Sequence, residues 1–210
     1  MEGFRQDGTR LICEQNHETI QIEPWGRDSL RVRATMNAAI RDDLPGALLE
    51  PTATESHIEI GEGRALIRNG KLTAEVSPDK NTTRFFNPIT SAEYLVEQAP
   101  RFRWPPTRNF APTNGDLFHV DVWFKAYEGE RFYGLGQHQH GHLDQKGCVI
   151  DLLQCNTEVA IPFLVSNRGY GFLWNNPAVG RVELGKNATR WVADATPQVD
   201  YWVTAGETPA

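Results

Sequence analysis

Apolar and polar residues alternate over many short stretches of this chain, and glycine, proline or asparagine usually separates one stretch from the next. Alternation with a period of two is typical of a β-strand that has one face on a core. Such strands are predicted at residues 19–23, 30–34 and 118–124, and further short strands are predicted at residues 83–86, 93–96, 159–165, 170–174, 181–184, 189–194 and 199–204. Strands this frequent, with only fragments of helical periodicity, predict an all-β sandwich with little helix.

One hairpin is predicted from local sequence. Residues 64–68 and 71–76 alternate, and Asn69-Gly70 joins them. This dipeptide is typical of a type I′ turn, in which both central residues have positive φ. We therefore expect a two-residue turn at Asn69 and Gly70.

Two segments are predicted to be loops. Residues 41–54 contain Pro45, Gly46 and Pro51, and residues 99–116 contain Pro100, Pro105, Pro106 and Pro112. Proline cannot donate a ladder hydrogen bond, so it disfavours central strands. No interdomain linker or internal repeat is evident in the 210 residues, and we predict one domain over residues 1–210.

Charge and composition narrow the classes of partner. The chain has 21 Lys and Arg against 27 Asp and Glu, a balance that offers no basic face for nucleic acid or anionic lipid. No apolar run approaches the roughly 20 residues of a membrane span, and the N-terminus lacks an apolar signal core. Three scattered cysteines form no disulfide framework. We expect a cytoplasmic protein that binds neither nucleic acid nor membrane.

A group of motifs in the second half of the chain resembles a known family. The motifs are Tyr133-Gly134-Leu135-Gly136-Gln137, then Asn156-Thr157-Glu158, then residues 161–176. Together they resemble the N-terminal domain of glycoside hydrolase family 31, the retaining α-glucosidases and α-xylosidases. The resemblance implies a galactose-mutarotase-like β-sandwich, or supersandwich. Gly134 and Gly136, as glycines, allow positive φ or the close approach of another chain segment, which suits a strand that bends at the interface with a catalytic barrel.

In that family the domain precedes a catalytic (β/α)8 barrel, which these 210 residues do not include. Thr208-Pro209 supplies an N-cap and a first helical residue, and so predicts that a helix begins there. We therefore expect the chain to be the front of a longer enzyme, whose own barrel is the main partner of this domain.

No catalytic residue is predicted. Retaining glycosidases use two carboxyl groups about 5–5.5 Å apart, and the family carries its nucleophile in a Trp-x-Asp-(Met/Phe)-x-Glu segment. Residues 191–194 come nearest and lie in a predicted strand. The isolated chain is expected to be inactive and to need no cofactor. The resemblance implies that the parent enzyme removes terminal α-linked xylose or glucose. Gln137 followed by His138-Gln139-His140 resembles the α-xylosidase-like branch, which slightly favours xylose.

The resemblance also implies residues that shape the sugar pocket. Asn156, Thr157 and Glu158 match a family Asn-x-Asp loop that reaches the barrel mouth, although Glu replaces Asp and the loop is short. Their amide and carboxylate groups suit sugar hydroxyls; a simple turn is the alternative. Gln137, His138 and the loop residue Trp104 complete the candidate substrate-binding set.

Three other interpretations remain open from the sequence. His138, His140 and His142 would share one face of a strand and meet a metal ion, whereas Gly136 and Gly141 favour an irregular loop; we expect no metal. A free-standing carbohydrate-binding module is a second possibility. A sugar mutarotase is a third, with His119 or His138 paired to Asp121 or Glu158 as acid and base.

Overall fold

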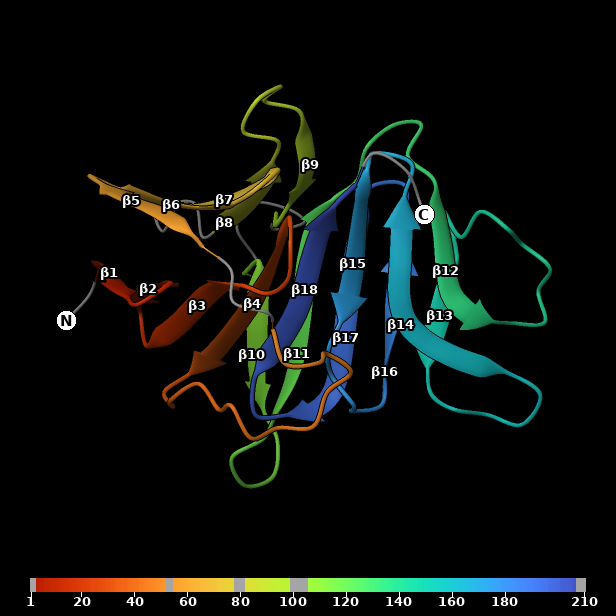
Figure 1. The fold of residues 1–210 in the computed structure, drawn as a ribbon. Helices are drawn as coiled ribbons and strands as arrows, with labels where there is room; N and C mark the ends of the chain where they lie inside the picture. Colours follow the sequence, from red (N-terminus) through yellow and green to blue (C-terminus); the bar gives the residue numbers. More distant parts are fainter. Residues whose placement is uncertain (1–2, 52–54, 78–81, 99–105, 207–210) are drawn as a thin grey trace.

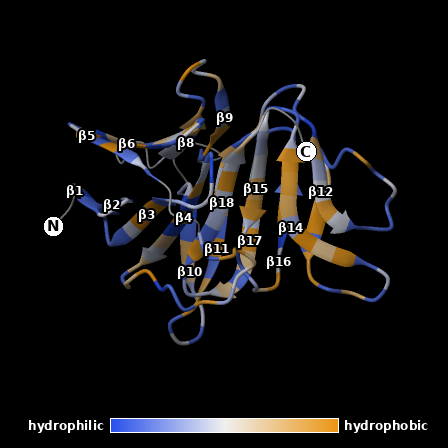
Figure 2. Ribbon diagram, viewed as in Figure 1, coloured by the Kyte–Doolittle hydropathy of each residue, from blue (hydrophilic) through white to orange (hydrophobic). Residues whose placement is uncertain are grey.

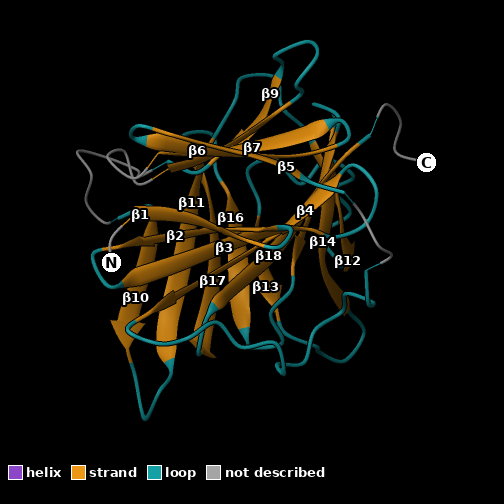
Figure 3. Cartoon of the chain, turned by 60° about the vertical axis from the view of Figure 1, so that its left-hand side comes forward, coloured by secondary structure: helices purple, strands orange, loops and turns teal. Residues whose placement is uncertain are grey.

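The computed structural model describes residues 3–51, 55–77, 82–98 and 106–206, and in these ranges the chain forms eighteen strands and no helix (Figures 1 and 3). The predicted all-β fold is confirmed. No helix that could cross a membrane occurs in this described part of the chain. Trp104 and the predicted helix start at Thr208-Pro209 lie outside the described residues.

The largest sheet has eight antiparallel strands in the order β1-β2-β3-β4-β18-β15-β14-β12. Their bounds are β1 (Gly3–Asp7), β2 (Arg10–Gln15), β3 (Glu18–Pro24), β4 (Ser29–Met36), β18 (Val199–Ala205), β15 (Tyr170–Trp174), β14 (Val159–Ser166) and β12 (Phe132–Gln137). Strands from both ends of the chain meet at its centre, where β4 pairs with β18. Segments that are far apart in the sequence therefore lie side by side in this sheet.

Two five-stranded sheets complete the fold. One has the order β10 (Arg108–Pro112), β11 (Phe118–Lys125), β17 (Ala188–Thr196), β16 (Gly180–Leu184) and β13 (Val149–Leu152). The other is a meander of β5 (His57–Gly61), β6 (Arg64–Asn69), β7 (Leu72–Ser77), β8 (Thr82–Phe86) and β9 (Glu93–Val96). Figure 3 shows this meander above the other two sheets.

An aromatic cluster joins the sheets. Phe172 of β15 stacks on Trp191 of β17 at 4.8 Å between ring centroids, and Tyr201 of β18 meets Phe124 of β11 edge-on at 5.8 Å. Phe85 of β8 contacts the same Tyr201 at 6.2 Å, which brings the meander into the core. Burial of these large rings stabilises the sandwich.

Residues 99–105 lie outside the described ranges, and over residues 106–116 the prediction of one loop was wrong, because β10 lies there and pairs with β11 along one edge of its sheet. The strand is anchored by Arg108, whose side chain is buried and bonds to Glu18 at 2.5 Å and to Glu97. Although burial opposes the charge, these two carboxylates hold the pKa of Arg108 above its ordinary value. Pro112 is tolerated at an edge strand.

The predicted hairpin is confirmed, but its turn lies one residue later. Asn69 pairs with Leu72, so Gly70 and Lys71 form the turn. Gly70 has φ of 55°, and Lys71 is absent from the positive-φ residues, which fits a type II′ turn better than type I′. The side-chain amide of Asn69 donates to the carbonyl oxygens of Gly26 and Ser29, both at 2.7 Å. These bonds hold Asn69 in the strand.

The first predicted loop is confirmed over its described part. We call residues 41–51 the strap, because this segment crosses the outer face of the eight-stranded sheet without forming a strand (Figure 1). Its backbone is bonded to side chains that flank β15 and β18, at Asn175 and Gln198. The strap is therefore fixed to the sheet at two points.

Candidate functional site

The segment that carries the family motif bends β12 sharply. Gly134, Leu135 and Gly136 have φ of 116°, 67° and 97°. A Cβ atom on Gly136 would lie 1.8 Å from the carbonyl oxygen of Val159, and one on Gly134 would lie 2.6 Å from that of Phe163. Both predicted properties of the glycines, positive φ and close backbone approach, are confirmed.

The bend coincides with a break in strand pairing. Gly134 pairs with Leu164 and Gly136 pairs with Ala160, so Ile161, Pro162 and Phe163 face Leu135 alone. Pro162 has no N–H to donate, which makes a regular ladder impossible there. Figure 1 shows the Val159 end of β14 curving out of the sheet. We call this end of β14, together with β12 and residues 138–158, the arm; residues 138–158 consist of β13 and the loops on either side of it, and we call them the arm loop.

A small polar cluster holds the two ends of the arm loop together. The side chain of Gln139 donates to the Thr157 hydroxyl, and its backbone N–H lies 3.4 Å from Glu158 Oε1. Glu158 Oε2 lies 3.5 Å from His138 Nδ1. Gln154 donates to the backbone oxygen of Glu158 at 2.6 Å. The loop is thus cross-linked at its base, and Glu158 faces His138.

The three histidines follow β12 in a loop and stack on one another. Their ring centroids are 5.6 Å apart between His138 and His140 and 5.2 Å apart between His140 and His142. His138 Nε2 bonds to the Leu135 carbonyl at 2.8 Å, and its side chain is only 7% exposed. Within the residues that the structure describes, no group of three His, Cys, Asp or Glu side chains is arranged to hold a metal ion.

The predicted site residues fall into two sets. His138, Thr157 and Glu158 come together around Gln139, and one carboxylate oxygen of Glu158 already faces His138. Gln137 ends β12 opposite Val159, and Asn156 lies exposed in the turn of the loop. Thr157 itself has φ of 71°, so the turn is tight. Trp104 cannot be assigned a place, because it lies outside the described ranges.

The structure also places the four residues considered as acid and base for a mutarotase, which are His119, His138, Asp121 and Glu158. His138 and Glu158 are neighbours, as above. His119, on β11, lies 3.6 Å from Asp194 of the adjacent strand. Asp121 is instead bonded to Trp123 and Arg190. Only the pair of His138 and Glu158 is brought together in the arm.

Exposed apolar side chains gather on the arm, a feature that the sequence prediction missed. They are Leu143 at 80% exposure, Val149 at 64%, Leu153 at 44%, Val159 at 43% and Ile161 at 49%. In Figure 2, β14 is hydrophobic along most of its length. Residues 159–165 are apolar at nearly every position, and this loss of alternation was the available signal.

The eight-stranded sheet, the opposing sheet and the glycine bend define the class of a galactose-mutarotase-like sandwich domain. The model of the glycosyl hydrolase 31 N-terminal galactose mutarotase-like domain matches residues 19–183. The chain belongs to this family of N-terminal domains of glycoside hydrolase family 31.

The chain is similar to several curated and solved proteins of that family. It is 35% identical over 209 residues to an uncharacterized family 31 glucosidase of Pseudescherichia vulneris, covering 90% of this chain and 39% of that protein. It is 32% identical to α-xylosidase A of Aspergillus niger, covering 97% of this chain and 30% of that protein. The crystal structure of a GH31 α-xylosidase from a soil metagenome, complexed with xylose, superposes with a TM-score of 0.89 at 35% identity, covering 99% of this chain and 33% of that one.

The chain therefore spans only about a third of the length of these relatives, from 30% to 39%.

Proposed function

We propose that this chain acts as the non-catalytic N-terminal domain of a retaining α-glycosidase for terminal α-linked xylose or glucose. In this proposal the domain packs on a catalytic barrel and lends the arm loop to the substrate pocket. The observation that carries the proposal is the arm itself. It joins the family motif, the polar loop and exposed apolar side chains at one end of the molecule.

The exposed side chains of the arm support a buried contact with another domain. Val159 and Ile161 are two residues apart on an extended strand and are each exposed to more than 40%. An apolar surface of this kind on a soluble domain marks an interaction site. The outer face of the five-stranded sheet that runs from β10 through β11, β17 and β16 to β13 is charged instead of apolar. A ladder of charged side chains crosses it, made of Arg181, Glu183, Arg190 and Asp121. The arm is therefore the favoured side for the barrel.

The polar loop supports a role in substrate binding. Gln139, Thr157 and His138 hold the base of the loop, which leaves the Asn156 amide at its exposed turn. A carboxamide both donates and accepts, as a sugar hydroxyl array requires. The substrate class rests on the relatives, several of which are α-xylosidases.

The test is a chimaera in which this chain replaces the corresponding N-terminal domain of the soil-metagenome α-xylosidase. We expect the chimaera to hydrolyse an aryl α-xyloside and the isolated chain to give no turnover. In the chimaera, Asn156→Ala should raise KM about three- to tenfold with kcat nearly unchanged, because a uniform binding contact is lost.

Asn114→Ala is the control, since Asn114 is also an exposed loop asparagine but lies between β10 and β11. Turnover by the isolated chain that a single Asp or Glu substitution abolishes would contradict the non-catalytic role. Equal KM values for Asn156→Ala and Asn114→Ala would contradict the role of the loop.

A further inference from the structure

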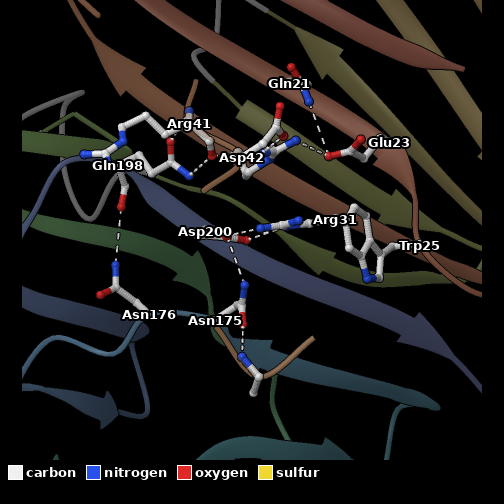
Figure 4. Close-up of polar contacts among 12 residues, drawn as sticks. Gln21, Glu23, Trp25, Arg31, Arg41, Asp42, Asn175, Asn176, Gln198 and Asp200 are labelled. Atoms are coloured by element: carbon white, nitrogen blue, oxygen red, sulfur yellow. Dashed lines mark hydrogen bonds and ion pairs between the residues drawn. The ribbon is translucent and has the colours of Figure 1, made fainter. Parts of the chain in front are cut away.

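A groove separates the strap from the outer face of the eight-stranded sheet. Its volume is about 630 Å³, within the range of small-molecule sites. Side chains from β2, β3, β4, the strap and the end of β15 line it, among them Arg10, Glu23, Trp25, Arg31, Asp42 and Asn175. Figure 4 shows most of these residues. The groove contains none of the residues of the arm.

The strap forms a fixed roof over this groove. Its Ala47 N–H donates to Asn175 Oδ1 at 2.7 Å, and the Trp25 indole N–H donates to the Leu49 carbonyl at 2.9 Å. The backbone N–H of Arg41 donates to the Gln198 side chain at 2.9 Å. A Cβ atom on Gly46 would meet the Asn175 amide at 2.5 Å, so the strap lies directly against it. The groove is preorganised and does not depend on the strap closing.

The floor carries charges that compensate one another. Arg31 binds Asp200 through two bonds of 3.0 and 2.6 Å, and Asp200 also accepts from Asn175 at 3.0 Å. Glu23 lies between Arg10 at 3.1 Å and the fully buried Arg33 at 2.5 Å. These pairs hold donors and acceptors in place while leaving little excess of either sign. Such a lining favours a neutral ligand over an anion or a metal cation.

Trp25 adds apolar surface to this polar lining. The Arg31 guanidinium lies 4.4 Å from the Trp25 ring centroid, which fixes the ring beside the charged floor. Among the charged lining side chains, Arg10 is 40% exposed and Asp42 is 66% exposed, so both are accessible to a ligand, and Asp42 also accepts from Arg33 at 2.6 Å. Glu50 of the strap is exposed as well. One aromatic ring with guanidinium, carboxylate and carboxamide groups matches a ligand that has both hydroxyl groups and C–H faces.

We infer that the strap groove binds a neutral oligosaccharide. The indole ring would contact the C–H face of a sugar unit, while Arg10 and Asp42 bond to its hydroxyl groups. The inference goes beyond the proposed function, because neither the barrel nor the arm loop takes part in it.

The experiment titrates the isolated chain with maltotriose, cellotriose, xylotriose and, separately, inorganic phosphate. Binding is followed by calorimetry and by tryptophan fluorescence. We expect saturable binding of at least one trisaccharide and none of phosphate. Arg10→Ala should weaken that binding about tenfold, as expected for one lost charge-assisted hydrogen bond. Trp25→Ala should weaken it at least as much.

Arg64→Ala is the matched control, because Arg64 is 64% exposed on β6 and does not line the groove. Thermal unfolding of each variant checks that the fold is kept, and Arg10→Ala decides the result if Trp25→Ala fails to fold. No saturable binding of any trisaccharide would overturn the inference. Binding of phosphate in place of sugar, or equal affinity in Arg10→Ala and Arg64→Ala, would overturn it as well.

Discussion

At the scale of single residues, Gly136 is required by geometry. Its φ of 97° and the Val159 carbonyl oxygen, which would lie 1.8 Å from an added Cβ, leave no room for a side chain. We predict that Gly136→Ala lowers the free energy of unfolding by about 2–4 kcal/mol, since strain and a backbone clash add. Urea unfolding measures this change in the free energy of unfolding. Gly141→Ala is the control, with φ of 71° but open space around it, and a loss as large as at Gly136 would contradict the clash.

A second residue-scale prediction concerns Glu93. Partial burial raises the pKa of its carboxyl group, but hydrogen bonds from Tyr127, Lys125 and Arg84 outweigh this and hold the pKa below its ordinary value of 4.5. A carboxyl group with a lowered folded pKa stabilises the protein above its unfolded pKa, and this contribution is lost as pH falls through the folded pKa.

We therefore expect Glu93→Gln to destabilise the protein by about 1–2 kcal/mol at pH 7. The difference from the unsubstituted protein should shrink as pH falls below about 4.5. Urea unfolding at pH 7 and in acid measures both values. Glu59→Gln serves as the control, because its side chain is 63% exposed. A Glu93→Gln deficit that persists unchanged in acid would contradict the assignment.

At the scale of elements, the β6–β7 hairpin is attached to the turn between β3 and β4. The Asn69 amide donates to two backbone carbonyls there, and Asp28 accepts from the Lys71 N–H at 2.7 Å. Asn69→Ala would leave buried carbonyls unpaired, and we predict a loss of about 2–4 kcal/mol in urea unfolding. Asn187→Ala, in an exposed loop, should cost under about 0.5 kcal/mol. Equal losses would show that the attachment contributes little.

Strands were predictable from sequence where one face alone is buried. In β16, Val182 and Leu184 are buried while Arg181 and Glu183 are half-buried, which reproduces the alternation in the sequence. β10 was not predictable, because its buried residue is Arg108 and its partners Glu18 and Glu97 are distant in sequence. The hairpin turn shifted for a similar reason, since tertiary bonds to Asn69 override the local preference.

The same limit applies to the candidate site. The glycines at 134 and 136 could be predicted, because a need for positive φ is visible in the residue type itself. The contacts of Gln139 with Thr157 and of His138 with Glu158 could not, since the bend in β12 and β14 brings these residues together across the loop.

At the scale of the whole molecule, the two outer faces and the arm differ in character. The strap covers part of the eight-stranded sheet, and a charged ladder covers part of the β10–β13 sheet. The arm presents Val149, Val159 and Ile161 to solvent. In our proposal, the exposed apolar side chains make the arm the side that is buried against the catalytic barrel.

The most direct measurement of that account is the α-xylosidase activity and thermal stability of the chimaera with Ile161→Asp or Ile60→Asp. The two isoleucines are equally exposed, at 49%, but Ile161 lies on the arm and Ile60 on β5. A charge buried in an interface is costly, so Ile161→Asp should lower the unfolding temperature and remove most of the activity, while Ile60→Asp changes neither. Unchanged activity and stability in Ile161→Asp, or equal losses in both variants, would contradict docking through the arm.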